Sequence, residues 1–117
     1  MENLDYMCAK YGEELAEIAK DENLLRKSLG ALQEDGLYAF IIYLEKEKQK
    51  EIRKKIEQFL RKGEIIRGEE DLKNRSQDIY TNLHRLLLLK SVIERMLVYA
   101  IYHIKAGEKK WVGNASS

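Results

Sequence analysis

The sequence predicts an all-α fold, a single compact helical bundle of five to six helices that ends in a long C-terminal helix. Three observations favour this class. The chain contains no proline, its apolar residues recur at three- and four-residue steps, and no strand-like alternation between turn residues occurs. Because 117 residues match the commonest size of one domain, we expect residues 1–117 to form a single helical domain, with residues 107–117 as a poorly ordered tail.

The first helix is predicted over residues 4–20. Its apolar stripe follows helical spacing and consists of Leu4, Cys8, Tyr11, Leu15 and Ile18. A second helix is expected to begin at Asp21 or Asn23, because these side chains accept hydrogen bonds from the free amides of a first turn. It is expected to end near residues 35–36, because Gly36 can adopt the left-handed conformation that closes a helix.

The segment 37–44 is a run of eight apolar or aromatic residues and taken alone is also consistent with a buried strand. Residues 45–62 continue it without a breaker and have a helical pattern, so we interpret residues 37–47 as a buried helix. Residues 46–62 then form an edge helix that ends at Gly63. Its narrow apolar stripe consists of Ile52, Ile56, Phe59 and Leu60.

Residues 63–70 form the longest predicted loop. The last helix is predicted from the segment 71–106, which contains no glycine, with a kink or break near residues 74–76. Its seam follows a heptad pattern: Ile79, Leu83, Leu86, Lys90, Ile93, Leu97, Ala100 and Ile104. A second apolar group lies toward the other side: Leu88, Leu89, Val92, Met96 and Tyr99. A helix that is apolar on two sides is expected to be central, between neighbouring helices. The same seam is also consistent with a coiled-coil dimer.

Charge is distributed unevenly along the chain, although the net charge is +1. Residues 1–35 carry nine acids and four bases, and residues 46–62 carry eight bases and three acids. The bases on one side of the predicted edge helix are Lys46, Lys50, Arg53, Lys54 and Arg61. A row of cations suits a polyanion, bound through its phosphates in a salt-sensitive way. The alternative is an ordinary charged surface, in which Glu57 pairs with Arg53 and Arg61.

The sequence gives no catalytic or metal-binding pattern, so we expect neither an enzyme nor a bound cofactor. His84 and His103 are the only histidines, and on one helix they lie roughly 30 Å apart, too far to share a metal. A small helical ribonuclease remains an alternative, because one family uses an Arg and a His on one helix with four to six residues between them. Seven residues separate Arg95 from His103, and eight separate Arg75 from His84, so neither pair has that spacing.

The sequence predicts a cytoplasmic location. Cys8 is the only cysteine, so no internal disulfide can form. Acidic residues occupy the N-terminus, where a signal peptide would have a basic region. The apolar runs 37–44 and 86–89 are far short of the ~20 residues that cross a bilayer.

Three motifs together resemble a known family. They are Ala9-Lys10-Tyr11, the Leu-rich segment 28–40 with its Asp35-Gly36-Leu37 turn, and a Leu-rich last helix that is under way by Tyr80-Thr81. Over residues 9–106 the chain resembles the small all-helical subunit of the Cmr-type, RNA-targeting CRISPR effector complex (type III-B).

The resemblance implies a non-catalytic subunit that packs against other effector subunits and copies of itself and lines the groove for guide and target RNA. It implies no small-molecule substrate. Applied to this sequence, it makes Lys50, Arg53, Lys54 and Arg61 the candidate RNA-binding residues and the acidic first helix a candidate subunit contact. The alternative is a stand-alone helical interaction or dimerisation protein.

Overall fold

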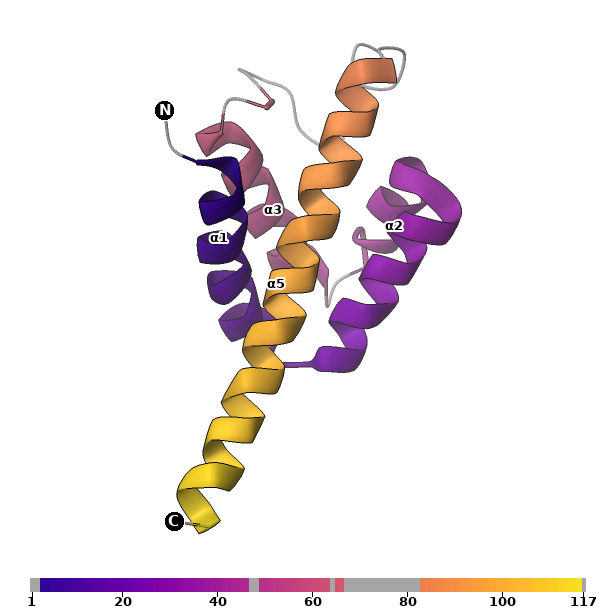
Figure 1. Ribbon diagram of the computed structural model, residues 1–117. Helices are drawn as coiled ribbons and strands as arrows, with labels where there is room; N and C mark the ends of the chain where they lie inside the picture. Colours follow the sequence, from indigo (N-terminus) through magenta and orange to yellow (C-terminus); the bar gives the residue numbers. More distant parts are fainter. Residues whose placement is uncertain (1–2, 47–48, 64, 67–82, 117) are drawn as a thin grey trace.

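The computed structural model describes residues 3–46, 49–63, 65–66 and 83–116, with side chains described through residue 107. Every regular element in these residues is a helix: α1 (Leu4–Ala19), α2 (Glu22–Tyr43), α3 (Lys50–Lys62) and α5 (Leu83–Ser116) (Figure 1). The predicted all-α class is therefore confirmed for this part of the chain. The predicted total of five to six helices is not confirmed by these four.

Helix α1 begins and ends at the residues that its sequence favours. The Asn3 side chain accepts hydrogen bonds from the amides of Asp5 at 2.8 Å and Tyr6 at 3.3 Å, which satisfies two of the free donors of the first turn. Lys20 closes the helix in the left-handed conformation with φ 52°. The middle of the predicted stripe is buried, whereas Leu4 and Ile18 at its two ends are exposed.

The break predicted near Gly36 is present inside α2. Asp21 accepts a hydrogen bond from the Leu24 amide at 3.2 Å and starts the helix. Gly36 then has φ 92° and ψ 176°, a conformation that is essentially restricted to glycine. The helix bends there, and Leu37, Phe40 and Ile41 of its second part are buried.

The predicted continuity from residue 37 to residue 62 is wrong. Helix α2 ends at Tyr43, the Glu45 amide donates to the Ile42 carbonyl at 3.1 Å, and α3 begins at Lys50. No glycine or proline lies between the two helices. Leu44 and Ile52 are both completely buried, and the turn allows both to join one core. Lys46 consequently lies outside α3, with its ammonium 5.1 Å from the centroid of the Tyr43 ring.

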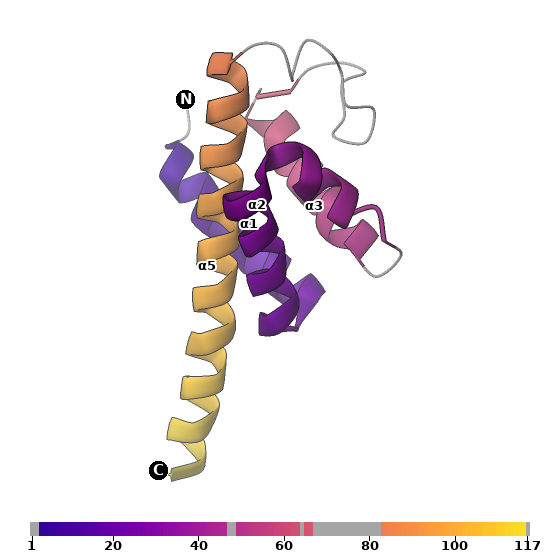
Figure 2. The same ribbon diagram turned by 90° about the vertical axis from the view of Figure 1, so that its right-hand side faces the viewer.

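Helix α5 is the central helix, as predicted. It packs against α1 and α2, whereas α3 packs mainly against α1. Figure 1 shows α5 passing between α1 and α2, and Figure 2 shows the same arrangement from the side. Buried residues of all four helices form one hydrophobic cluster, to which α5 contributes Leu89, Val92, Ile93, Met96, Leu97, Ala100 and Ile101.

Gly12 allows α1 and α5 to approach closely. A Cβ atom at Gly12 would lie 2.8 Å from the Tyr99 Cβ and 2.9 Å from the Met96 carbonyl oxygen. One of these atoms belongs to the backbone of α5 and the other is attached to it directly, so neither can shift unless the whole helix shifts. The first and last parts of the described chain are therefore in backbone contact.

Helix α5 extends to Ser116, beyond the end near Ala106 that the apolar pattern predicts. Its last turns project past the other helices (Figure 1), which explains why no apolar periodicity accompanies them. Poor order of residues 107–117 stays a prediction. The predicted break near residues 74–76 and most of the predicted loop 63–70 lie outside the described residues.

Candidate nucleic-acid interface

An open hollow of about 540 Å³ lies where α3 meets α1. It is lined by Tyr11 of α1 and by Lys54, Gln58, Arg61 and Lys62 of α3. Three of these five side chains are cationic, and the Lys54 Nζ also lies 3.4 Å from Oε1 of the exposed Glu51. Because α3 presents Lys54, Gln58 and Arg61 at steps of four and three residues, they follow one side of the helix. We call this set the basic hollow.

The predicted RNA-binding residues do not form one exposed row. Lys54 and Arg61 are exposed and meet at the basic hollow. Arg53 lies toward the protein, with a side chain only 12% exposed, and its Nη1 donates to Glu57 Oε1 at 3.2 Å. Lys50 is partly buried. The alternative interpretation of Arg53 as a partner of Glu57 is therefore confirmed.

Lys62 is a lining residue that the sequence did not single out. It follows Arg61 directly and so lies about 100° away around the helix, outside the predicted row. The only sequence signal was the consecutive pair Arg61-Lys62 before Gly63.

Lys55 attaches α3 to α1 beside the hollow. Its ammonium lies 3.5 Å from Glu14 Oε2 and 5.5 Å from the centroid of the Tyr11 ring. The Tyr11 ring also lies 5.4 Å from the Phe59 ring, centroid to centroid. Tyr11 is thus covered on more than one side and is 8% exposed. It offers no open ring face on which a base could stack, so contacts at the hollow are expected to be with phosphates.

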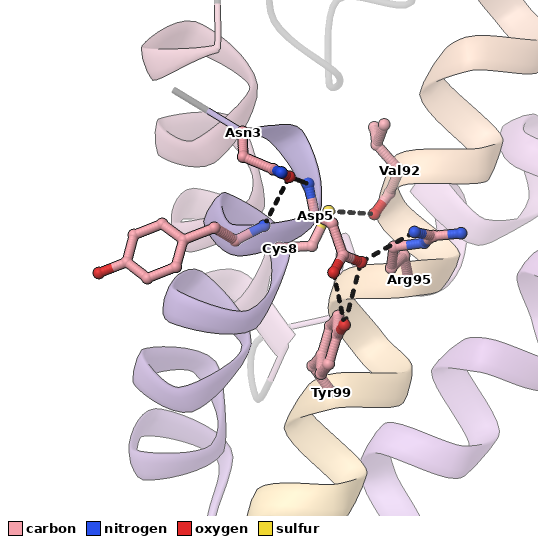
Figure 3. Close-up of polar contacts among 7 residues, drawn as sticks. Asn3, Asp5, Cys8, Val92, Arg95 and Tyr99 are labelled. Atoms are coloured by element: carbon pink, nitrogen blue, oxygen red, sulfur yellow. Dashed lines mark hydrogen bonds and ion pairs between the residues drawn. The ribbon is translucent and has the colours of Figure 1, made fainter. Parts of the chain in front are cut away.

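A second polar cluster joins α1 to α5 (Figure 3). Arg95 Nη1 donates to Asp5 Oδ1 at 2.8 Å, and the Tyr99 hydroxyl lies 3.0 Å from both Asp5 oxygens. The hydrogen bond to Asp5 raises the pKa of Tyr99. Residues 90 or more positions apart in sequence make these contacts, so no local sequence signal indicated the cluster.

Cys8 lies beneath this cluster, and its thiol is not activated as a nucleophile. Its Sγ is 3.8 Å from the Val92 carbonyl oxygen, to which the thiol donates (Figure 3). Burial raises the pKa of Cys8 to about 11, while the positive charge of Arg95 acts in the opposite direction and the negative charge of Asp5 adds to the increase. The thiol is therefore protonated at neutral pH, whereas nucleophilic cysteines need a lowered pKa.

The Arg and His of the alternative ribonuclease are not brought together. Arg95 binds Asp5, and His103 lies eight residues further along α5, about 12 Å along the axis. Arg75 lies outside the described residues. Within the described ranges, no three His, Cys, Asp or Glu side chains gather in a way that would hold a metal ion. No described helix combines the length and the apolar character needed to cross a bilayer.

The basic hollow is thus an open cationic surface on an edge helix, and the Asp5 cluster is a structural link between the first and last helices. Comparison with models of protein families, with curated proteins and with solved structures finds no match to this chain.

Proposed function

We propose that this chain is the small, non-catalytic helical subunit of an RNA-guided CRISPR effector complex of the Cmr type (type III-B), acting in the cytoplasm. In this proposal it packs against other effector subunits and copies of itself, and α3 faces the guide and target RNA. The observation that supports the proposal is the basic hollow, where three cations line one open surface, one of which, Lys54, also pairs with the exposed Glu51 at 3.4 Å.

The chemistry of the hollow favours a backbone contact. Lysine and arginine side chains neutralise phosphates whatever the base, and the one aromatic residue in the lining is buried. A subunit that must accept any guide sequence needs this kind of sequence-independent binding. Of the residues that the resemblance suggested, Lys54 and Arg61 are retained, Lys62 is added, and Arg53 is assigned to the internal pair with Glu57.

The first test measures the binding of a single-stranded RNA by fluorescence anisotropy at several salt concentrations. The triple variant Lys54→Glu, Arg61→Glu and Lys62→Glu is expected to weaken binding about tenfold or more. Each phosphate contact adds about 0.7 to the salt slope for single strands, so the slope should fall by about 2.

A matched control changes the same charge elsewhere. Lys10, Lys20 and Lys105 are exposed and do not line the hollow, and their reversal to Glu should leave the salt slope close to that of the unchanged protein. Equal losses in the two variants would show that only net charge matters and would remove the hollow from the proposal.

Membership of the complex is tested separately. The tagged chain, purified from its source cells, is expected to carry guide RNA together with the backbone subunits, identified by RNA sequencing and mass spectrometry. A chain that is recovered without guide RNA would contradict the proposed assembly, even if the isolated protein binds RNA.

A further inference from the structure

A second hollow, of about 440 Å³, lies at the opposite end of α3 from the basic hollow. It is lined by Asp21, Asn23, Leu24, Lys27, Tyr43, Lys46 and Gln49. Gln49 precedes α3 and Arg61 lies near its end, so these two residues are about 18 Å apart along the helix axis. Nothing proposed above uses this second hollow, which we call the Gln49 pocket.

Gln49 is the unusual residue of this pocket. It is only 6% exposed, and its Oε1 is buried without a hydrogen-bond partner. Buried side-chain amides normally satisfy their polar atoms, so an exception calls for an explanation. Because the last torsion of a glutamine side chain is broad, the carboxamide can turn to present either its oxygen or its NH2 group to a molecule in the pocket.

The other lining residues show what kind of molecule would suit the pocket. Lys27 and Lys46 are exposed cations on its two sides, and the Tyr43 ring holds the Lys46 ammonium at 5.1 Å from its centroid. The pocket also lies at the N-terminal turn of α2, where the helix dipole favours a negative charge. Asp21 already accepts the Leu24 amide as the cap of that helix.

We propose that the Gln49 pocket binds a nucleotide. Lys27 and Lys46 hold its phosphate, and the side-chain amides of Gln49 and Asn23 bind the polar edge of its base. Two side-chain amides can each donate and accept, which is the pairing that proteins use to read base edges. The volume of about 440 Å³ falls in the range of small-molecule sites. The nucleotide comes either free from solution or as one residue of an RNA strand.

The test compares three probes by titration calorimetry on the full chain: AMP, ribose 5-phosphate and inorganic phosphate. AMP is expected to bind at least tenfold more tightly than the two probes that lack a base. Gln49→Leu should reduce AMP binding to the level of ribose 5-phosphate and leave ribose 5-phosphate itself unchanged. Lys27→Ala with Lys46→Ala should weaken all three probes. Gln49→Glu, which keeps the size of the side chain, provides a second variant if the leucine variant fails to fold.

Two outcomes overturn the inference: AMP that binds no better than ribose 5-phosphate, or AMP binding that is unchanged in both Gln49 variants. Lys54→Ala in the basic hollow is the control and should not affect AMP, so a failure here is distinguishable from a failure of the proposed RNA face. A short single-stranded RNA that displaces AMP assigns the pocket to the strand, whereas an RNA that leaves AMP bound assigns it to free nucleotides.

Discussion

Gly12 lies where even a methyl group would collide with α5. An alanine methyl would lie 2.8 Å from the Tyr99 Cβ and 2.9 Å from the Met96 carbonyl oxygen, so α1 and α5 would have to separate. We expect Gly12→Ala to lower the free energy of unfolding by about 1–3 kcal/mol, as overpacking of a core does. Urea denaturation measures this change.

The control for Gly12→Ala is Gly30→Ala. Gly30 also lies in a helix, and nothing lies within 4 Å of the added Cβ. Alanine is the better helix former, so this variant should be more stable by about 0.5–1 kcal/mol. A Gly12→Ala protein that is equally stabilised would show that the two helices do not meet as described.

Because the Cys8 thiol is buried, we expect the free energy of unfolding to depend on pH in the alkaline range. Its pKa is raised from 9.0 to about 11, so the unfolded chain loses this proton before the folded protein does. The contribution of the protonated Cys8 thiol to the free energy of unfolding is therefore complete below pH 9. It is lost as the pH rises through about 11. Tyr99 acts in the same direction, because its pKa is raised as well.

The Cys8 contribution is measured by comparison with Cys8→Ala. Between about pH 8 and about pH 10.5, urea unfolding should show a larger loss of stability in the unchanged protein than in the variant, which keeps Tyr99. Iodoacetamide should also label Cys8 only at the rate of unfolding. Rapid labelling of the folded protein at neutral pH would contradict the buried position.

At the scale of the elements, Gly36 controls the bend of α2. Its φ of 92° and ψ of 176° are strained for any residue with a side chain, although a Cβ there would meet nothing within 4 Å. Gly36→Ala is thus expected to destabilise the protein by about 1–3 kcal/mol through backbone strain alone. Thermal unfolding followed by circular dichroism measures the effect, and Gly30→Ala serves again as the control on the same helix. A stabilised Gly36→Ala would mean that α2 is straight.

The helices and the bend could be predicted because local signals specify them. Asn3 and Asp21 cap helices through their own side chains, Gly36 permits a conformation that other residues avoid, and the apolar residues of α5 repeat at helical spacing. The turn between α2 and α3 has no such signal. The turn exists because Leu44 and Ile52 are buried in one core. Their burial depends on the tertiary packing of the helices and leaves no local pattern in the sequence.

The residues of the basic hollow could be predicted only in part, because they too depend on how the helices pack. The angular positions of Lys54 and Arg61 placed them correctly on one side of α3. The orientation of α3 against α1 determines which of its cations are exposed. In this orientation Arg53 lies toward the protein and pairs with Glu57. The contacts of Asp5 with Arg95 and Tyr99 depend on the packing of α1 on α5, which the periodicity of either helix does not specify.

At the scale of the whole molecule, α3 depends on α1 for its place. It packs mainly against α1, through the Tyr11–Phe59 ring contact and the pair of Lys55 with Glu14, whereas α5 is covered from two sides. Native-state hydrogen exchange should therefore show that the amides of α3 open with a lower free energy than those of residues 89–101 in α5. Identical opening free energies in both helices would show that α3 separates only when the entire protein unfolds.

The contact between Gly12 and the Met96–Ala100 backbone also has a consequence for synthesis on the ribosome. Helix α1 is made first, but the surface that covers Met7, Cys8 and Leu15 includes residues 89–101, which are translated last among the core residues. Until that segment leaves the exit tunnel, the side of α1 that packs against α5 stays exposed, although α3, which also packs against α1, has already been made. Folding of the nascent chain is accordingly completed late, and chaperones have the longest access to its first twenty residues.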